Sequence, residues 1–292
     1  MEMTENELLK AMDDSEYFHT LTPAQKLHTL IQDVMRNGSV KKKNYNDWLK
    51  TPDKSESISQ EEKLDEILDV LQMEQPGRTL VLLDRMNFMQ FCLPKCFPLI
   101  RGKRTYSAIL RNFDACTQTD LSYRVNVFFF PFDTIYSKQT MLEANFDPET
   151  VDWMIRAIEK HPEFIQIKSV ERLKEFLNQN GIEFYYYINE FATSIFEITM
   201  MREFSRLDTK QVVDIIINRG DPLFLRDLKI SKEDLLEAGI KEADIENTMN
   251  LLMEHCLKKP ADNTREQLLK YAMTFNRGLF KNRMTKGISR FF

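Results

Sequence analysis

The stretch "TPAQKLHTLIQDVMRNG", from Thr22 to Gly38, carries the signals that decide the fold class. Thr22 has a side chain suited to capping a helix N-terminus, and Pro23 follows at the first helical position. Apolar side chains then recur at the spacing of one helix face: Leu27, Leu30, Ile31 and Val34. Gly38 provides the stop. The stretch therefore predicts an amphipathic helix whose two ends are encoded by its own residues.

The same signals recur along the chain. Capping-box spacing is found at Ser59 and Glu62, at Ser231 and Asp234, and at Thr264 and Gln267. Helices are expected within 22–38, 59–72, 77–94, 104–117, 120–131, 147–162, 169–181, 183–204, 209–220, 231–239, 242–260 and 264–273. Residues 39–57 read as a polar linker. No run shows the two-residue alternation of a strand over a useful length. The chain has only 8 glycines and 10 prolines, which favours short loops between helices. The predicted fold is an all-α, multi-helix array.

Composition narrows the class of protein further. The 292 residues carry a net charge of −5, so no global positive field attracts nucleic acid. The N-terminus is acidic and lacks an apolar run, and no stretch approaches the ~18 apolar residues of a membrane span. We therefore expect a cytoplasmic protein, with no membrane partner, whose four cysteines are free thiols. Cys92 and Cys96 have C-x3-C spacing, but a zinc site would need two more nearby ligands. Buried structural thiols are the favoured interpretation.

No catalytic motif is evident. The phosphate-binding sequence G-x4-G-K-[ST] is missing, and no serine has both an elbow context and a histidine partner. The histidines are scattered, and none precedes an aspartate: His19, His28, His161 and His255. Paired carboxylates such as Asp65 and Asp69 read as a solvated helix face. We expect no catalytic residue, no metal ligand and no cofactor.

The segment near the C-terminus is the most informative. It reads "GDPLFLRDLKISKEDLLEAGI", then a longer helix, then "PADNTREQLLKYA". This resembles the tail of bacterial CCA-adding tRNA nucleotidyltransferases and the related poly(A) polymerases, over residues 214–272. Upstream, "SQEEKLDEILDVLQMEQPGRTLVLLDRMNFMQFCLP" and "AILRNFDACTQTDLSYRVNVFFF" are similar to that family's neck and body. The resemblance spans residues 57–273. It implies three parts: an N-terminal helical segment and linker (1–56), a neck-and-body domain (57–205) and a tail domain (206–292).

Two departures from the family bear on catalysis. Members with an HD-type domain continue into Leu-Leu-His-Asp-Ile-Gly, whereas this chain has "FFFPFDT" from Phe128 to Thr134. Phe130 and Pro131 stand at the His and Asp positions, and His161 falls where the family often has another histidine of the motif. Within the chain, the same stretch reads as a packed helix end stopped by Pro131. The family's polymerase head has no counterpart either, because residues 1–56 are too few and too helical. The resemblance therefore implies neither nucleotide addition nor HD hydrolysis.

The parts of the family that this chain resembles, the neck, body and tail, are those that bind tRNA in the family. We expect a non-catalytic RNA-binding protein for tRNA or a tRNA-like RNA, with no DNA partner. Cations would contact the phosphate backbone. The candidates are Arg219, Arg226, Lys229, Lys232, Lys258, Lys259, Arg265, Arg277, Lys281, Arg283, Lys286 and Arg290. The family has glycines after "GI", where this chain has "KEADIEN". Glu242, Asp244 and Glu246 argue against RNA contact at that turn.

Two alternatives remain open. The first is a regulatory or scaffolding subunit that binds a protein partner, for example a separate nucleotidyltransferase head. The acidic net charge favours it, and so would an exposed tyrosine face in "EFYYYINEF" at residues 183–191. The second is a diverged enzyme in which Asp133, His161 and neighbouring carboxylates hold one metal ion.

Overall fold

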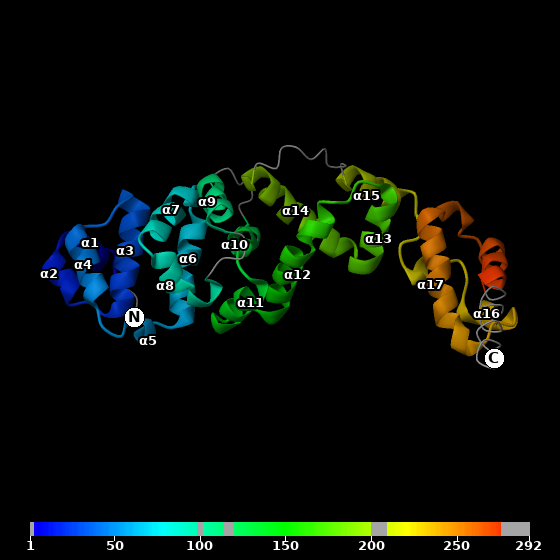
Figure 1. The fold of residues 1–292 in the computed structure, drawn as a ribbon, viewed down its shortest axis with the longest axis horizontal. Helices are drawn as coiled ribbons and strands as arrows, with labels where there is room; N and C mark the ends of the chain where they lie inside the picture. The colour runs from blue at the N-terminus through cyan, green and yellow to red at the C-terminus, as the bar shows by residue number, and fades with distance from the viewer. Residues whose placement is uncertain (1–2, 98–101, 114–119, 200–208, 276–292) are drawn as a thin grey trace, which may run out of the picture. The chain divides into compact units, whose positions relative to one another are not determined.

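The computed structural model describes residues 3–97, 102–113, 120–199 and 209–275, and these segments are helices joined by short connections (Figure 1). No strand occurs in any of them, which confirms the predicted all-α class. None of the helices in these segments combines the length and the apolar character needed to cross a membrane.

The chain divides into two compact units. Residues 1–163 and 187–204 form one, called the N-terminal unit below, and residues 164–186 and 205–292 form the C-terminal unit. Two helices, α12 and α14, contribute residues to both. The predicted boundaries after residues 56 and 205 stay predictions.

The N-terminal unit begins with short helices whose ends are set by local capping. Thr22 accepts a hydrogen bond from the Gln25 backbone N–H, and Gly38 closes the same helix with a left-handed φ of 66°, as the sequence predicts. Thr4 and Glu7 form a further capping box, in addition to those that the sequence predicts. The helices are α1 (Glu5–Asp13), α2 (Ser15–His19), α3 (Pro23–Asn37), α4 (Lys42–Lys50) and α5 (Lys54–Ser57).

The predicted polar linker 39–57 is wrong, because most of it forms α4 and α5. Trp48 is buried and its ring packs against Phe88 and Phe91, with centroids 5.9 and 5.1 Å away. The Tyr45 hydroxyl donates to the Met86 carbonyl at 3.0 Å. Contacts with a segment about forty residues further along the chain thus stabilise a helix whose own sequence is mostly polar.

The next group of helices is α6 (Gln60–Gln72), α7 (Pro76–Arg85), α8 (Phe88–Cys92), the 3-10 turn η1 (Pro94–Cys96) and α9 (Gly102–Asn112). The Ser59–Glu62 capping box starts α6 as predicted. The single helix predicted over 77–94 is wrong, since it is broken between α7 and α8. Asn87 adopts a left-handed φ of 61° at the break, a conformation that asparagine tolerates better than most residues.

The thiols behave as expected of buried cysteines. Cys92, Cys96 and Cys256 are free and buried, and burial raises the pKa of each. A thiol held in its neutral form is a poor nucleophile and a poor metal ligand. Cys116 lies outside the described residues.

The stretch "FFFPFDT" is a packed helix end, as the sequence predicts. Asp120 caps α10 (Leu121–Phe129), and every residue from Phe128 to Phe132 is buried. The Phe132 ring contacts Phe128 and Phe129 as well as Tyr106 of α9. This aromatic cluster forms part of the core of the N-terminal unit.

The helix predicted to stop at Pro162 continues to Phe164, so that α12 spans Pro148–Phe164 and contains this proline. Proline costs a helix the hydrogen bond of its missing N–H and clashes with the preceding turn. Only two helical residues follow Pro162, and Phe164 is buried against Phe176 and Tyr185 at 5.3 and 5.9 Å. Packing of Phe164 thus favours the extra half turn. The preceding helix, α11, spans Thr134–Glu143.

The C-terminal unit contains α13 (Val170–Asn180), the first residues of α14 (Ile182–Thr199), α15 (Thr209–Asn218), η3 (Leu225–Asp227), α16 (Lys232–Glu237), α17 (Glu242–Lys258), η4 (Pro260–Asp262) and a helix over 265–275. Gly181, Gly220 and Gly239 follow the helices they were expected to end. Among the described side chains of the long apolar α14, six apolar ones are buried: Phe184, Tyr185, Ile188, Phe191, Ala192 and Ile195.

Candidate nucleic-acid interface

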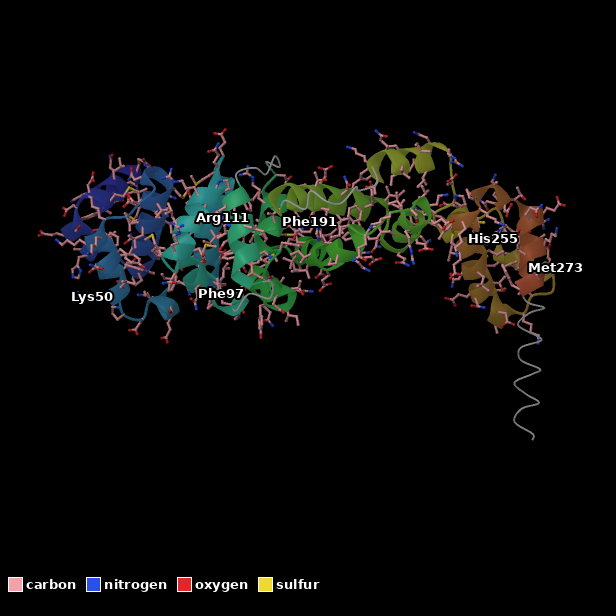
Figure 2. The ribbon with its side chains drawn as sticks, turned by 45° about the horizontal axis from the view of Figure 1, so that its top comes forward. Lys50, Phe97, Arg111, Phe191, His255 and Met273 are labelled. Carbon is pink, nitrogen blue, oxygen red and sulfur yellow. The ribbon has the colours of Figure 1, made fainter. Side chains whose placement is uncertain are left out.

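Two segments of the C-terminal unit lie side by side and carry half of the predicted site residues. The first is 226–234, from η3 into α16, and the second is 255–265, from the end of α17 into the last described helix. Together they contain six Lys or Arg and four Asp or Glu, so they are positive in a chain whose net charge is −5. Figure 2 labels His255 and Met273, which mark α17 and the helix after it.

Asn263 joins the two segments. Its side-chain amide donates to the Asp227 carbonyl at 2.9 Å, and its side-chain carbonyl accepts from the Lys229 backbone N–H, also at 2.9 Å. Asn263 is buried, with 8% of its surface exposed. A buried amide that satisfies two loop backbones fixes their relative positions. The sequence motif "PADNT" thus has a structural role at this junction.

A second link between the segments engages Arg265. Its Nε and Nη2 donate to Oδ1 of Asp234 at 2.8 and 2.6 Å, while Oδ2 of Asp234 accepts from the Ser231 backbone N–H in the predicted capping box. The hydrogen bond from Arg265 is the main cause that lowers the pKa of Asp234. Arg265 is therefore committed to an internal ion pair and is a weaker candidate for RNA contact than the sequence indicates.

Four of the predicted lysines are exposed and form no ion pair within the described part of the chain: Lys229, Lys232, Lys258 and Lys259. We call them the four-lysine group. Lys232 opens α16, and Lys258 ends α17. Flexible ammonium groups on rigid helix ends can follow phosphates without strict geometry. This group has the chemistry of a backbone-binding surface.

Two more of the predicted RNA-binding arginines lie within the described residues, and their surroundings differ. Arg226 is 79% exposed, lies 4.0 Å from Asp227 and stacks on the Phe224 ring, 4.9 Å from its centroid. Arg219 is 65% exposed, and its Nε lies 3.7 Å from the Asp221 carboxylate. Arg226 is therefore the better placed of the two to meet an anion.

The acidic turn that argued against RNA contact lies at the far end of α17. Glu242 begins this helix and Lys258 ends it, so about 24 Å of helix separates them. Asp244 is buried, whereas Glu242 and Glu246 are exposed. Since screening at physiological salt acts over about 8 Å, these acids do not cancel the charge of Lys258 and Lys259 at the other end of the helix.

The other five predicted cations lie outside the described residues: Arg277, Lys281, Arg283, Lys286 and Arg290.

The residues of the alternative enzyme hypothesis have structural roles. Asp133 caps α11 by accepting from the backbone N–H groups of Ile135 and Tyr136. His161 is buried, and its ring contacts Phe130 and Phe191, with centroids 4.9 and 5.6 Å away. The metal site suggested for Asp133 and His161 is not among the groups of possible metal ligands in the described part of the chain.

The chain matches no protein-family model, no curated protein and no solved structure. These comparisons give no support to the resemblance to CCA-adding enzymes, which comes from the sequence motifs.

Proposed function

We propose that this chain binds tRNA or a tRNA-like RNA through its phosphate backbone and does not itself add nucleotides. The observation that carries the proposal is the four-lysine group, in which two segments held together by Asn263 present exposed, unpaired cations at the start of α16 and at the end of α17. Helical clamps that read RNA by shape need no base-reading motif.

The core of the N-terminal unit supports descent from the CCA-adding family. Phe130 stands at the position that the resemblance gives to one histidine, and His161 stands at another. The two side chains are in contact, with centroids 4.9 Å apart. Residues that would share a metal site in an HD domain are thus neighbours here, with a phenylalanine in place of one ligand. Residues 5–57 form five helices, which supports the proposal that no polymerase head lies within this chain.

The test is binding of purified full-length protein to labelled tRNA, measured by fluorescence anisotropy at 50 and 200 mM salt. Four phosphate contacts predict that affinity falls roughly 100-fold over this range, since each contact adds about −0.9 to the slope of log K against log salt. An unstructured RNA of equal length is the control and should bind more weakly. Failure to bind tRNA at 50 mM salt would refute the proposal.

One observation favours a protein partner as the second candidate. Ile215 on α15 is 52% exposed, and Tyr186 on α14 is 37% exposed with its hydroxyl near Asp214. The other tyrosines of the run are less accessible: Tyr185 is buried, and Tyr187 stacks on Tyr123. Affinity purification from native cells tests this candidate. A stoichiometric protein that is retained by the wild type and released by Ile215→Lys supports it.

A further inference from the structure

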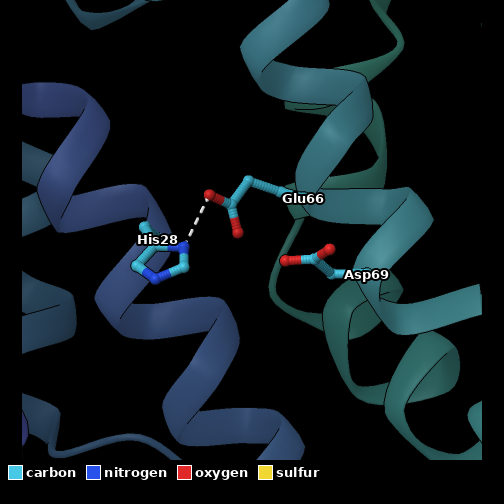
Figure 3. Close-up of side chains that lie close together, drawn as sticks. All are labelled: His28, Glu66 and Asp69. Carbon is cyan, nitrogen blue, oxygen red and sulfur yellow. Dashed lines mark hydrogen bonds and ion pairs between the residues drawn. The ribbon is translucent and has the colours of Figure 1, made fainter. Parts of the chain in front are cut away.

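A cluster of potential metal ligands lies in the N-terminal unit, between α3 and α6, two helices that pack against each other (Figure 3). His28 lies on the second turn of α3. Glu66 and Asp69 lie three residues apart on α6, a spacing that places both on one face of the helix. The Nδ1 atom of His28 lies 2.8 Å from Oε1 of Glu66.

The second oxygen of Glu66 is incompletely satisfied. Oε2 is buried and has no hydrogen-bond partner within the described residues. The Glu66 side chain is only 14% exposed, and desolvation by burial is the main cause that raises its pKa. A buried carboxylate oxygen without a partner is rare in native proteins and often marks an ion or water. The contact with His28 engages Oε1 of Glu66 and thus leaves Oε2 available to a ligand such as a metal ion.

Asp69 provides a third ligand atom. One ligand atom from each residue can be chosen so that all three lie within 4.8 Å of one another. Tetrahedral zinc with bonds of about 2.1 Å needs ligand atoms about 3.4 Å apart. Asp69 is exposed, so its side chain can rotate without disturbing the core. Such a rotation can bring its carboxylate oxygen to the ligand spacing that zinc needs.

The surroundings leave room for a further ligand. A cavity of about 660 Å³ borders the cluster and is lined by His28 and Glu66, with two more carboxylates from Glu62 and Asp65. Zinc sites with three protein ligands keep a fourth position for water or substrate. The cavity offers space for such a ligand beside His28 and Glu66.

We propose that His28, Glu66 and Asp69 bind one divalent transition-metal ion, with Zn²⁺ as the best match, and that this ion clamps α3 to α6. One imidazole and two carboxylates suit zinc, manganese or iron, whereas magnesium and calcium prefer oxygen ligands alone. The proposal concerns different residues and a different unit from the RNA surface, so either can fail without the other.

The test uses full-length protein stripped with a chelator and then titrated with Zn²⁺ by calorimetry. We expect one equivalent to bind, and the melting temperature of the N-terminal unit to rise with added zinc. Asp69→Asn should weaken binding at least tenfold while leaving the fold intact, because Asp69 is exposed. His28→Ala should abolish binding.

His19→Ala is the matched control. His19 also pairs with a carboxylate, since its Nδ1 lies 2.6 Å from Oδ1 of Asp47, but the pair belongs to no three-residue ligand group within the described part of the chain. This variant should bind zinc like the wild type. Absence of one-equivalent binding, equal binding by Asp69→Asn, or equal loss in His19→Ala would each overturn the proposal.

Discussion

The ammonium of Lys174 lies 2.6 Å from the carboxylate of Asp221, and the two side chains are only 6% and 7% exposed. This ion pair joins α13 to the loop that follows α15. On the same helix, the Asn178 amide donates to the Leu223 carbonyl at 2.6 Å. The loop that leads into η3 is thus held to α13 by one charged and one neutral hydrogen bond.

Replacing Asp221 with alanine should destabilise the C-terminal unit by about 3–5 kcal/mol, because it leaves the Lys174 charge buried without a partner. Hydrogen exchange followed by mass spectrometry on α13 peptides measures the loss of protection. Glu175→Ala is the control, since Glu175 pairs with Arg172 on the exposed face of the same helix and should contribute about 0–1 kcal/mol. Wild-type protection in the Asp221 variant would show that the pair is dispensable.

Replacing Phe132 with alanine should destabilise the N-terminal unit by about 3–5 kcal/mol, through lost burial and the cavity left behind. Phe132 is fully buried and its ring contacts four others. Tryptophan fluorescence during urea unfolding is a selective probe, because Trp48 and Trp153, the only tryptophans, both belong to this unit. Ile135→Ala removes a side chain that is 67% exposed and should change stability by less than about 0.5 kcal/mol. Similar midpoints for the two variants would contradict the packing argument.

The helices were predictable from the sequence where local residues encode their ends. Thr22, Ser59, Asp120 and Ser231 all cap helices as their spacing indicates, because a cap hydrogen bond involves residues two or three positions away. The helix predictions were wrong where contacts between residues far apart in the sequence determine whether a helix forms. Helix α4 depends on Trp48 packing against α8, a contact that no local rule encodes.

The site was predictable only in part for the same reason. The exposure of the four-lysine group could be predicted from the residue type, since lysine is rarely buried. The ion pair that engages Arg265 joins it to Asp234, 31 residues earlier, and His28 meets Glu66 across 38 residues. Such pairs become visible only when helix packing is known. The His28 cluster therefore has no signature among neighbouring residues of the sequence.

Replacing Arg265 with glutamine should raise the pKa of Asp234 toward its usual value of 3.8, because the hydrogen bond from Arg265 is the main cause of its lowering. A carboxyl whose pKa is lowered by folding stabilises the fold above its unfolded pKa. That contribution is lost as the pH falls through the folded value. Carbon-13 NMR titration of the Asp234 carboxyl measures the shift directly.

The control for this titration is Arg226→Gln, which removes an arginine of the same region that lies 4.0 Å from Asp227 and forms no ion pair with Asp234. Its Asp234 pKa should match that of the wild type. If Arg265→Gln left the Asp234 pKa unchanged, the ion pair would not exist in solution, and Arg265 would again be available for RNA.

Reversing the charges of Lys258 and Lys259 to glutamate should weaken tRNA binding and reduce the slope of log K against log salt by about 2, one for each lost phosphate contact. Both side chains are exposed, so the fold should survive. Anisotropy titrations at several salt concentrations measure affinity and slope together.

Lys42→Glu with Lys43→Glu is the matched control, because it makes the same change in net charge on an exposed pair in the N-terminal unit. If the four-lysine group is the binding surface, the slope of log K against log salt should fall only in the Lys258 and Lys259 variant. Equal losses in both would mean that overall charge governs binding, and the four-lysine group would have no special part in it.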